Sequence, residues 1–190
     1  ELQSSGEWNK ATDLMIDAAQ RLEKGGAELM VICTNTMHKM YDEVQAAVGI
    51  PMLHIVDAVM LEIKSQGIQS VGLLGTRFTM EQDFYVQRIK AHQVEVVIPP
   101  QEERNIVHRV IYDELVMGKI LPDSRDAYQR IIQNLAQQGA QGIILGCTEI
   151  GLLIQPEDVP LPIFDTSFHH AMAAVKIALV SKNLEEYLPI

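Results

Sequence analysis

The stretch GIILGCTEIG, residues 142–151, contains a short apolar run that ends in a cysteine followed by a threonine. LMVICTNTMHKM, residues 29–40, repeats this arrangement around Cys33. A Gly-Ala pair precedes each apolar run, and a predicted strand led by a proline follows each one, within 50–58 and 161–166. Two matching elements in the same order indicate a duplicated unit.

Short apolar runs alternate with helical patterns along the chain. We expect strands at 29–32, 52–55, 71–74, 94–97, 143–146 and 162–164. We expect helices at 8–26, closed by Gly25 and Gly26, and at 37–47, 57–66, 80–91, roughly 101–117, roughly 124–138 and 166–181. Such alternation is typical of parallel βαβ units with both sheet faces covered. We therefore predict an α/β fold of two similar lobes, each a parallel sheet flanked by helices, with the active site in the cleft between them.

The two copies differ in length at their front. Val71, which opens the second copy, lies 76 residues before Cys147, whereas only 32 residues precede Cys33. The repeat therefore predicts that the first copy lacks about 44 residues, including its opening strand or strands. We expect a first lobe of residues 1–66 plus 165–190 and a second lobe of residues 67–164.

Composition narrows the class of protein. The chain has 190 residues, 47% of them apolar, and a formal net charge of −10. An acidic chain is a poor match for nucleic acid or anionic membranes. The apolar runs are too short to cross a bilayer, and no signal peptide is visible, so we expect a cytoplasmic protein. No metal-binding spacing, Walker loop, GxGxxG turn or GxSxG elbow is present, so we expect no metal and no dinucleotide.

The two cysteines have two interpretations. A free cysteine is commonly a small buried hydrophobe, and each alone favours that role. Together, Cys33 and Cys147 both follow a strand and precede a threonine, at the strand end where ligands bind in parallel sheets. Such a pair suits proton transfer in which one thiolate removes a proton from carbon and the opposite thiol returns one. Each cysteine precedes a predicted helix start, which we expect to lower its pKa.

Polar residues next to the cysteines are candidate ligands. Helix capping is the alternative role for these residues, and the two roles are compatible. They are Thr34, Asn35, Thr36 and Thr148. Thr76, in the turn of LLGTRFTM (73–80), is a further candidate with the same two roles. Glu149 has three possible roles: it tunes Cys147, contacts a substrate amine, or is a first-turn helix carboxylate. His38 is expected to be a surface or partly buried helix residue.

The motifs CTNT and GCTE resemble those of the aspartate/glutamate racemase family. The similarity continues through GTRFTMEQDFY, EERNIVHRVIYDEL, QGAQGIILGCTEIGLL and PIFDT, and so covers essentially the whole chain. It is strongest to the aspartate racemase and broad-specificity amino-acid racemase branch.

This resemblance implies an amino-acid racemase that uses no pyridoxal phosphate and forms a homodimer. It places Cys33 and Cys147 on opposite faces of the substrate α-carbon. The carboxylate ligands it implies are Thr34, Asn35, Thr36 and Thr76, with Thr148 and Glu149 on the other side. The amino acid that is preferred stays open.

One departure concerns specificity. Aspartate-selective relatives carry a lysine in the segment that matches IYDELVMGK, and here the matching position is Val116, with Lys119 in a different register. This leaves room for neutral amino acids. The alternatives are a related isomerase acting on maleate or hydantoins, a truncated fragment that folds without activity, and a redox switch that joins the two cysteines.

Overall fold

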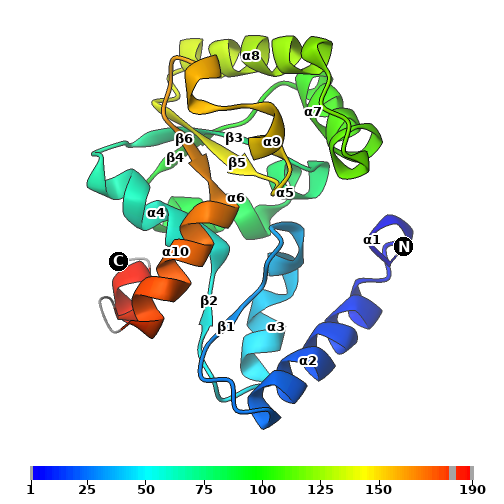
Figure 1. Ribbon diagram of the computed structural model, residues 1–190, viewed down its shortest axis with the longest axis vertical. Coiled ribbons are helices and arrows are strands. Elements are labelled where there is room, and N and C mark those ends of the chain that lie inside the picture. Colours follow the sequence, from blue (N-terminus) through cyan, green and yellow to red (C-terminus); the bar gives the residue numbers. More distant parts are fainter. Residues whose placement is uncertain (1, 180–182, 189–190) are drawn as a thin grey trace.

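The chain forms two separate parallel sheets, as Figure 1 shows. The computed structural model describes residues 2–179 and 183–188. The larger sheet has four strands in the order β4-β3-β5-β6. They are β3 (Ser70–Gly75), β4 (Glu95–Val97), β5 (Gly142–Gly146) and β6 (Ile163–Asp165). All pairs are parallel, so the carboxyl ends of these strands lie at one edge.

The smaller sheet pairs β1 (Met30–Val31) with β2 (Met52–Leu53). Helices from the first part of the chain cover it (Figure 1). They are α1 (Leu2–Ser5), α2 (Trp8–Lys24), the 3-10 turn η1 (Thr36–Met40) and α3 (Tyr41–Ala46). Ala11 and Ala19 of α2 and Val44 of α3 pack with Met30 in a core of their own. The face of α2 that carries Ala11 and Ala19 therefore packs in this lobe, whereas Leu14 and Leu22 on the same helix are exposed.

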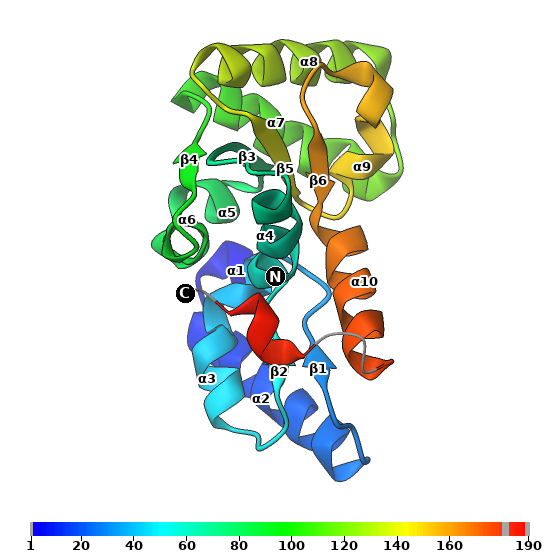
Figure 2. The same cartoon turned by 90° about the vertical axis from the view of Figure 1, so that its left-hand side faces the viewer.

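The remaining helices surround the larger sheet or connect the two lobes. They are α4 (Ile55–Ser65), α5 (Arg77–Glu81), α6 (Asp83–Ala91), α7 (Gln101–Asp113), η2 (Leu115–Met117), α8 (Pro122–Gln137), α9 (Ile150–Leu153), η3 (Pro156–Asp158), α10 (Thr166–Ala178) and η4 (Leu184–Tyr187). In Figure 2 the larger sheet lies between α7 and α8 on one side and α4 on the other. Both faces are thus covered, as the continuous apolar strands predict.

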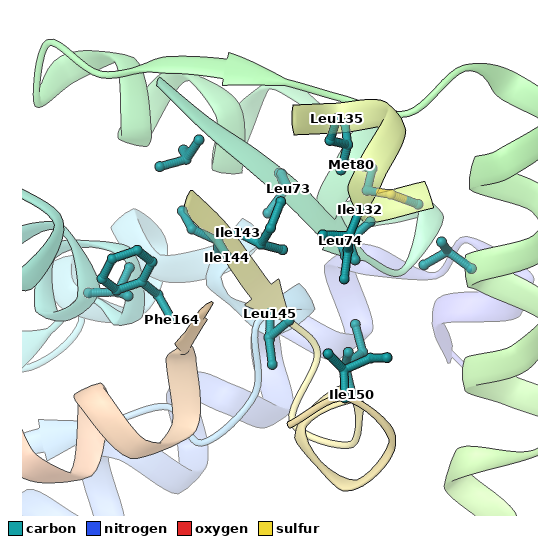
Figure 3. Packing of buried hydrophobic residues seen from close by; sticks show 14 of the residues in the cluster. Leu73, Leu74, Met80, Ile132, Leu135, Ile143, Ile144, Leu145, Ile150 and Phe164 are labelled. Atoms are coloured by element: carbon teal, nitrogen blue, oxygen red, sulfur yellow. The ribbon is translucent and has the colours of Figure 1, made fainter. Parts of the chain in front are cut away.

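The main core lies on the larger sheet. Figure 3 shows apolar side chains from neighbouring strands, among them Leu74, Ile144 and Phe164, together with Ile132 and Leu135 of α8. All five are at most 1% exposed. Burying such side chains stabilises the fold by roughly 1.5–3 kcal/mol each. This packed sheet gives the loops at its carboxyl edge a rigid base.

The predicted elements are confirmed in type and order, and their ends differ locally. The strand expected at 52–55 ends at Leu53, because the His54 ring caps α4 by accepting a hydrogen bond from the Val56 amide. The helix expected at 80–91 starts at Arg77 and is interrupted at Gln82, which has an extended backbone. The last helix ends at Ala178, and the predicted end at 181 lies outside the described residues.

The chain returns to the smaller sheet at its end. α10 packs against α4, and Ala173 of α10 and Tyr187 of η4 share a buried cluster with Leu53 and Ala58. The larger sheet includes β6, directly before α10. The lobe boundaries expected at 66/67 and 164/165 stay a prediction. Within residues 2–179 and 183–188, no helix combines the length and apolar character needed to span a bilayer.

Candidate active site

Two paired glycines bring the central strands of the larger sheet close together at their carboxyl ends. Gly75 of β3 lies opposite Gly146 of β5. A Cβ atom on Gly75 would be 2.8 Å from the Gly146 carbonyl oxygen, and one on Gly146 would be 2.9 Å from the Leu74 carbonyl oxygen. Neither position has room for a side chain, so glycine is required for this close approach. Thr76 and Cys147 are the residues that directly follow this pair at the ends of the two strands.

Seven of the eight predicted site residues line one cavity of about 140 Å³ at this edge. They are Thr34, Asn35, Thr36, Thr76, Cys147, Thr148 and Glu149. Gln3, Ile111, Tyr112 and Val116 complete much of the wall. A cavity of this size holds a molecule as small as benzene or a small amino acid. The seven residues are candidates named from the sequence. Gln3, Ile111 and Tyr112 are not, although the last two lie in the segment EERNIVHRVIYDEL.

Cys33 lies apart from this group. It is exposed and lines a neighbouring cavity of about 440 Å³, with Val31, Ile55 and Ser167 in the wall. The hydroxyl oxygen of Ser167 is buried without a hydrogen-bond partner. Thr148 lines both cavities, so the two cysteines belong to adjoining spaces with one residue in common.

Glu149 is in direct contact with Cys147. The Cys147 Sγ donates to Glu149 Oε2 at 2.9 Å, and the Thr148 hydroxyl donates to the same oxygen at 2.8 Å. Of the three roles considered for Glu149, this geometry favours the one that tunes Cys147.

The expectation of a lowered thiol pKa is wrong for Cys147. The pKa of Cys147 is raised to about 12, first by burial and then by the hydrogen bond and charge of Glu149. The helix that follows, α9, is only four residues long and begins beside that carboxylate. The local field is thus set by Glu149, and Cys147 is a protonated thiol near neutral pH.

The threonines are both caps and cavity walls. Thr76 caps α5, because its hydroxyl accepts from the Thr79 amide at 3.4 Å. The same hydroxyl lies 3.1 Å from that of Thr36. Thr36 is in the first lobe and Thr76 follows β3, so this contact joins the smaller sheet's turn to the larger sheet. Both hydroxyls border the cavity, which is compatible with capping and with ligand binding.

Buried histidines support the turn after Cys33 from behind. His38 is only 2% exposed, so the expectation of a surface or partly buried residue is corrected. Its Nδ1 donates to the Thr34 carbonyl at 2.9 Å, and its Nε2 accepts from the Ile55 amide at 3.1 Å. This pattern fixes one neutral tautomer. Burial lowers the pKa of His38 to about 3, so the ring stays neutral.

The His38 ring lies 4.4 Å from His54 and 5.9 Å from His170, between ring centres. Burial also lowers the pKa of both neighbours. Among the described residues, no group of three or more His, Cys, Asp or Glu side chains is arranged to hold a metal ion. We therefore assign these histidines to support of the turn.

Known proteins share this fold. The Asp/Glu/Hydantoin racemase family matches residues 1–174. The broad specificity amino-acid racemase RacX of Bacillus subtilis (strain 168) is 29% identical over 172 residues, which cover 89% of this chain and 73% of RacX.

Two solved structures extend the comparison. A candidate Asp/Glu racemase from Yersinia pestis is 52% identical with a TM-score of 0.88, and the match covers 94% of this chain and 78% of that one. An aspartate racemase homologue from Pyrococcus horikoshii OT3 is 37% identical with a TM-score of 0.83 and the same coverage. With the family match extending over most of the chain, the protein belongs to the Asp/Glu/Hydantoin racemase family.

Proposed function

We propose that this protein is a cytoplasmic amino-acid racemase that exchanges the α-proton between Cys33 and Cys147. The observation that carries the proposal is the pair of adjoining cavities, each with one cysteine in its wall and Thr148 common to both. A small substrate held beside Thr148 has a thiol on either side. The relation to RacX, a broad specificity amino-acid racemase, supports a substrate range beyond aspartate.

The chemistry needs one thiolate and one thiol. In one direction, the Cys33 thiolate takes the α-proton, so a C–H bond breaks and an S–H bond forms. Cys147, protonated at rest because its pKa is raised, gives its proton to the opposite face of the carbanion. In the reverse direction Cys147 is the thiolate and Cys33 the thiol, which is the state that the forward transfer leaves. A resting enzyme with a protonated Cys147 reaches this state when the Glu149 carboxylate at 2.9 Å takes the Cys147 proton and passes it to solvent, while the exposed Cys33 gains a proton from water.

The cavity wall supplies hydrogen-bond donors for the substrate carboxylate. We assign this role to Thr34, Thr36 and Thr76 from one side and to Thr148 from the other, with the remaining Asn35 N–H directed to the same space. Donors fixed in place stabilise the charge that develops as the proton leaves. The two thiols supply both proton-transfer groups, so the proposed reaction uses no pyridoxal phosphate or metal.

Two single-cysteine variants test the mechanism. Cys33→Ser and Cys147→Ser are incubated in D₂O with both enantiomers of aspartate, glutamate, leucine and methionine, and the products are separated by chiral chromatography. We expect each variant to lose racemisation by a factor of at least about 10³. Each variant retains one thiol and so continues to exchange deuterium into one enantiomer. Ser65→Ala, an exposed change at the end of α4, is the control.

The same assay separates the rival functions. Maleate and hydantoins are offered to the wild-type chain beside the amino acids. Turnover of maleate or hydantoins alone would replace our assignment by a related isomerase. Full racemisation by either single-cysteine variant would exclude the two-thiol mechanism, and no turnover of any compound would indicate a fragment that folds without activity.

We also propose that the protein acts as a homodimer. Phe168, Met172, Val175 and Leu179 are exposed at i, i+4, i+7 and i+11 along one stripe of α10 and its end. Such a stripe on a helix is apolar surface available for a second copy. Light scattering coupled to size-exclusion chromatography measures the mass, and a monomer at micromolar concentration contradicts this part.

A further inference from the structure

A chain of buried hydrogen bonds connects the two cysteine-bearing turns. The Tyr85 hydroxyl donates to Asn35 Oδ1 at 2.7 Å. Asn35 Nδ2 donates to the Thr166 hydroxyl at 3.0 Å, and that hydroxyl donates to the Leu145 carbonyl at 2.9 Å. Asn35 lies two residues after Cys33, and Leu145 lies two residues before Cys147. These hydrogen bonds therefore link the two cysteine-bearing turns through Thr166 of α10, and Tyr85 of α6 holds the Asn35 end.

The direction of every bond in this chain is fixed. The Leu145 carbonyl can only accept, so the single hydroxyl proton of Thr166 must point to it. The Thr166 oxygen then accepts from Asn35, which turns the Asn35 amide nitrogen toward Thr166 and its oxygen toward Tyr85. Tyr85 must donate, and burial raises its pKa, so its hydroxyl stays protonated. One removed hydroxyl leaves a buried partner unsatisfied.

These residues are held tightly. Tyr85 and Thr166 are fully buried, and Asn35 is 3% exposed. The Asn35 side-chain oxygen and one of its two side-chain N–H groups take part in these hydrogen bonds. The second side-chain N–H is therefore left for a ligand. The partners of Asn35 are remote in sequence, with Tyr85 50 residues and Thr166 131 residues away. Two remote parts of the polypeptide thus meet at the Asn35 amide, between the smaller and the larger sheet.

We propose that Tyr85 and Thr166 are positioning residues, which act through Asn35 to fix the Cys33 turn relative to the Cys147 turn. This inference rests on the proposed two-thiol function. Proton transfer to opposite faces of one carbon requires both thiols in place at once, and a shift of about 1 Å can lower the rate about 100-fold. Tyr85 and Thr166 keep that spacing through Asn35 and are not themselves part of the cavity wall.

Variants that remove one hydroxyl test this inference. Tyr85→Phe and Thr166→Val each delete one donor while keeping the buried volume, and Thr166→Ser keeps the hydroxyl. Tyr128→Phe is the matched control, since Tyr128 is also fully buried and its hydroxyl donates to the Val107 carbonyl at 3.0 Å. Circular dichroism first confirms that each variant folds. If Thr166→Val does not fold, Tyr85→Phe decides.

The readout is the split between kcat and KM for racemisation. We expect Tyr85→Phe and Thr166→Val to lower kcat by about tenfold or more with KM within about twofold. Thr166→Ser is expected to recover most of the turnover, and Tyr128→Phe to keep kcat within about twofold. Unchanged kcat in Tyr85→Phe overturns the proposal. A rise in KM with kcat intact also overturns it, because the network would then serve substrate binding.

A second measurement does not depend on turnover. The rate of alkylation of each cysteine by iodoacetamide is followed by mass spectrometry in the same variants. We expect Tyr85→Phe and Thr166→Val to change the rate of at least one cysteine by about threefold or more, with Thr166→Ser and Tyr128→Phe close to wild type. If the wild type racemises nothing, the proposed function fails, and these rates alone decide whether the network positions the thiols. Rates equal to wild type overturn the inference.

Discussion

Replacing Glu149 by glutamine is expected to make Cys147 far more reactive as a nucleophile. In the wild type, the Cys147 Sγ donates to Glu149 Oε2 at 2.9 Å. The pKa of this thiol is raised from 9.0 to about 12, first by burial and then by the hydrogen bond and charge of Glu149. Glutamine keeps the size of the side chain and removes the charge, so only burial continues to oppose ionisation strongly.

The size of the effect follows from the thiolate fraction. At pH 9, a thiol of pKa about 12 is ionised to about one part in a thousand, whereas a thiol of pKa 9.0 is half ionised. The thiolate is the species that alkylates. Each unit by which Glu149→Gln lowers the Cys147 pKa therefore raises its alkylation rate at pH 9 by about tenfold. We expect a rise of at least that factor.

The assay is iodoacetamide alkylation between pH 7 and 10.5, with each cysteine quantified by peptide mass spectrometry. The exposed Cys33 is an internal reference in every sample. Glu157→Gln, at an exposed position of η3, is the matched control for loss of one carboxylate. Equal Cys147 rates in Glu149→Gln and wild type refute the reasoning, as does a wild-type Cys147 that reacts faster than Cys33.

Three other perturbations have definite expected outcomes. Val116 lines the Cys147 cavity and is 47% exposed. Val116→Lys is expected to raise the ratio of kcat/KM for aspartate to kcat/KM for leucine by about tenfold, because the lysine ammonium can pair with the side-chain carboxylate of aspartate. An unchanged ratio contradicts this. Asp57 is 1% exposed and accepts hydrogen bonds from Arg88 and His92. Asp57→Ala is expected to lower the free energy of unfolding by about 3 kcal/mol in urea titrations, because both partners lose their buried acceptor. A loss below about 1 kcal/mol would show that these contacts are dispensable for stability. Below pH 6.5 the unfolded chain protonates His38, whereas the folded protein, with the His38 pKa lowered to about 3, does not. Each unit by which the pH is lowered below 6.5 should therefore reduce the free energy of unfolding by about 1.4 kcal/mol through this histidine. A free energy of unfolding from urea titrations that stays constant between pH 6.5 and 5 argues against it.

The larger sheet could be predicted from the sequence because its strands are continuous apolar runs. The strand expected at 71–74 is present within β3, and the one expected at 143–146 is present within β5. Their residues are buried on both faces of the sheet. A continuous apolar run in the sequence therefore predicts a strand covered on both sides. The smaller sheet was less predictable. His54, expected to continue a strand, instead caps α4, and that choice depends on packing between lobes.

The site was predictable where two copies of a motif repeat and unpredictable where distant residues converge. The Cys-Thr repeat identified six residues that line one cavity, and the turn after the strand at 71–74 added Thr76. It did not predict that Cys33 would line the adjoining cavity or that Cys147 would have a raised pKa. Tyr85 and Thr166 end the segments GTRFTMEQDFY and PIFDT, but nothing in those segments indicates that the two residues share a partner. Their importance follows only from bonds that span 50 and 131 residues of sequence.

The two cysteines have unequal surroundings, and a racemase limits how that inequality can appear. Cys33 is exposed, whereas Cys147 is half-buried and donates to Glu149. Enantiomers have equal free energy in water, so kcat/KM must be the same for both directions at every pH. The asymmetry of the site can therefore give the two enantiomers different kcat values only if their KM values differ by the same factor. In the proposed two-thiol mechanism, a resting Cys147 thiol is ready to donate, so the enantiomer whose proton faces Cys33 meets the ready form. The other enantiomer would react only after Glu149 has taken the Cys147 proton and Cys33 has gained one from solvent. Under this proposal, Glu149 is the residue through which the sequence difference between the two Cys-Thr copies becomes a kinetic difference between the two enantiomers.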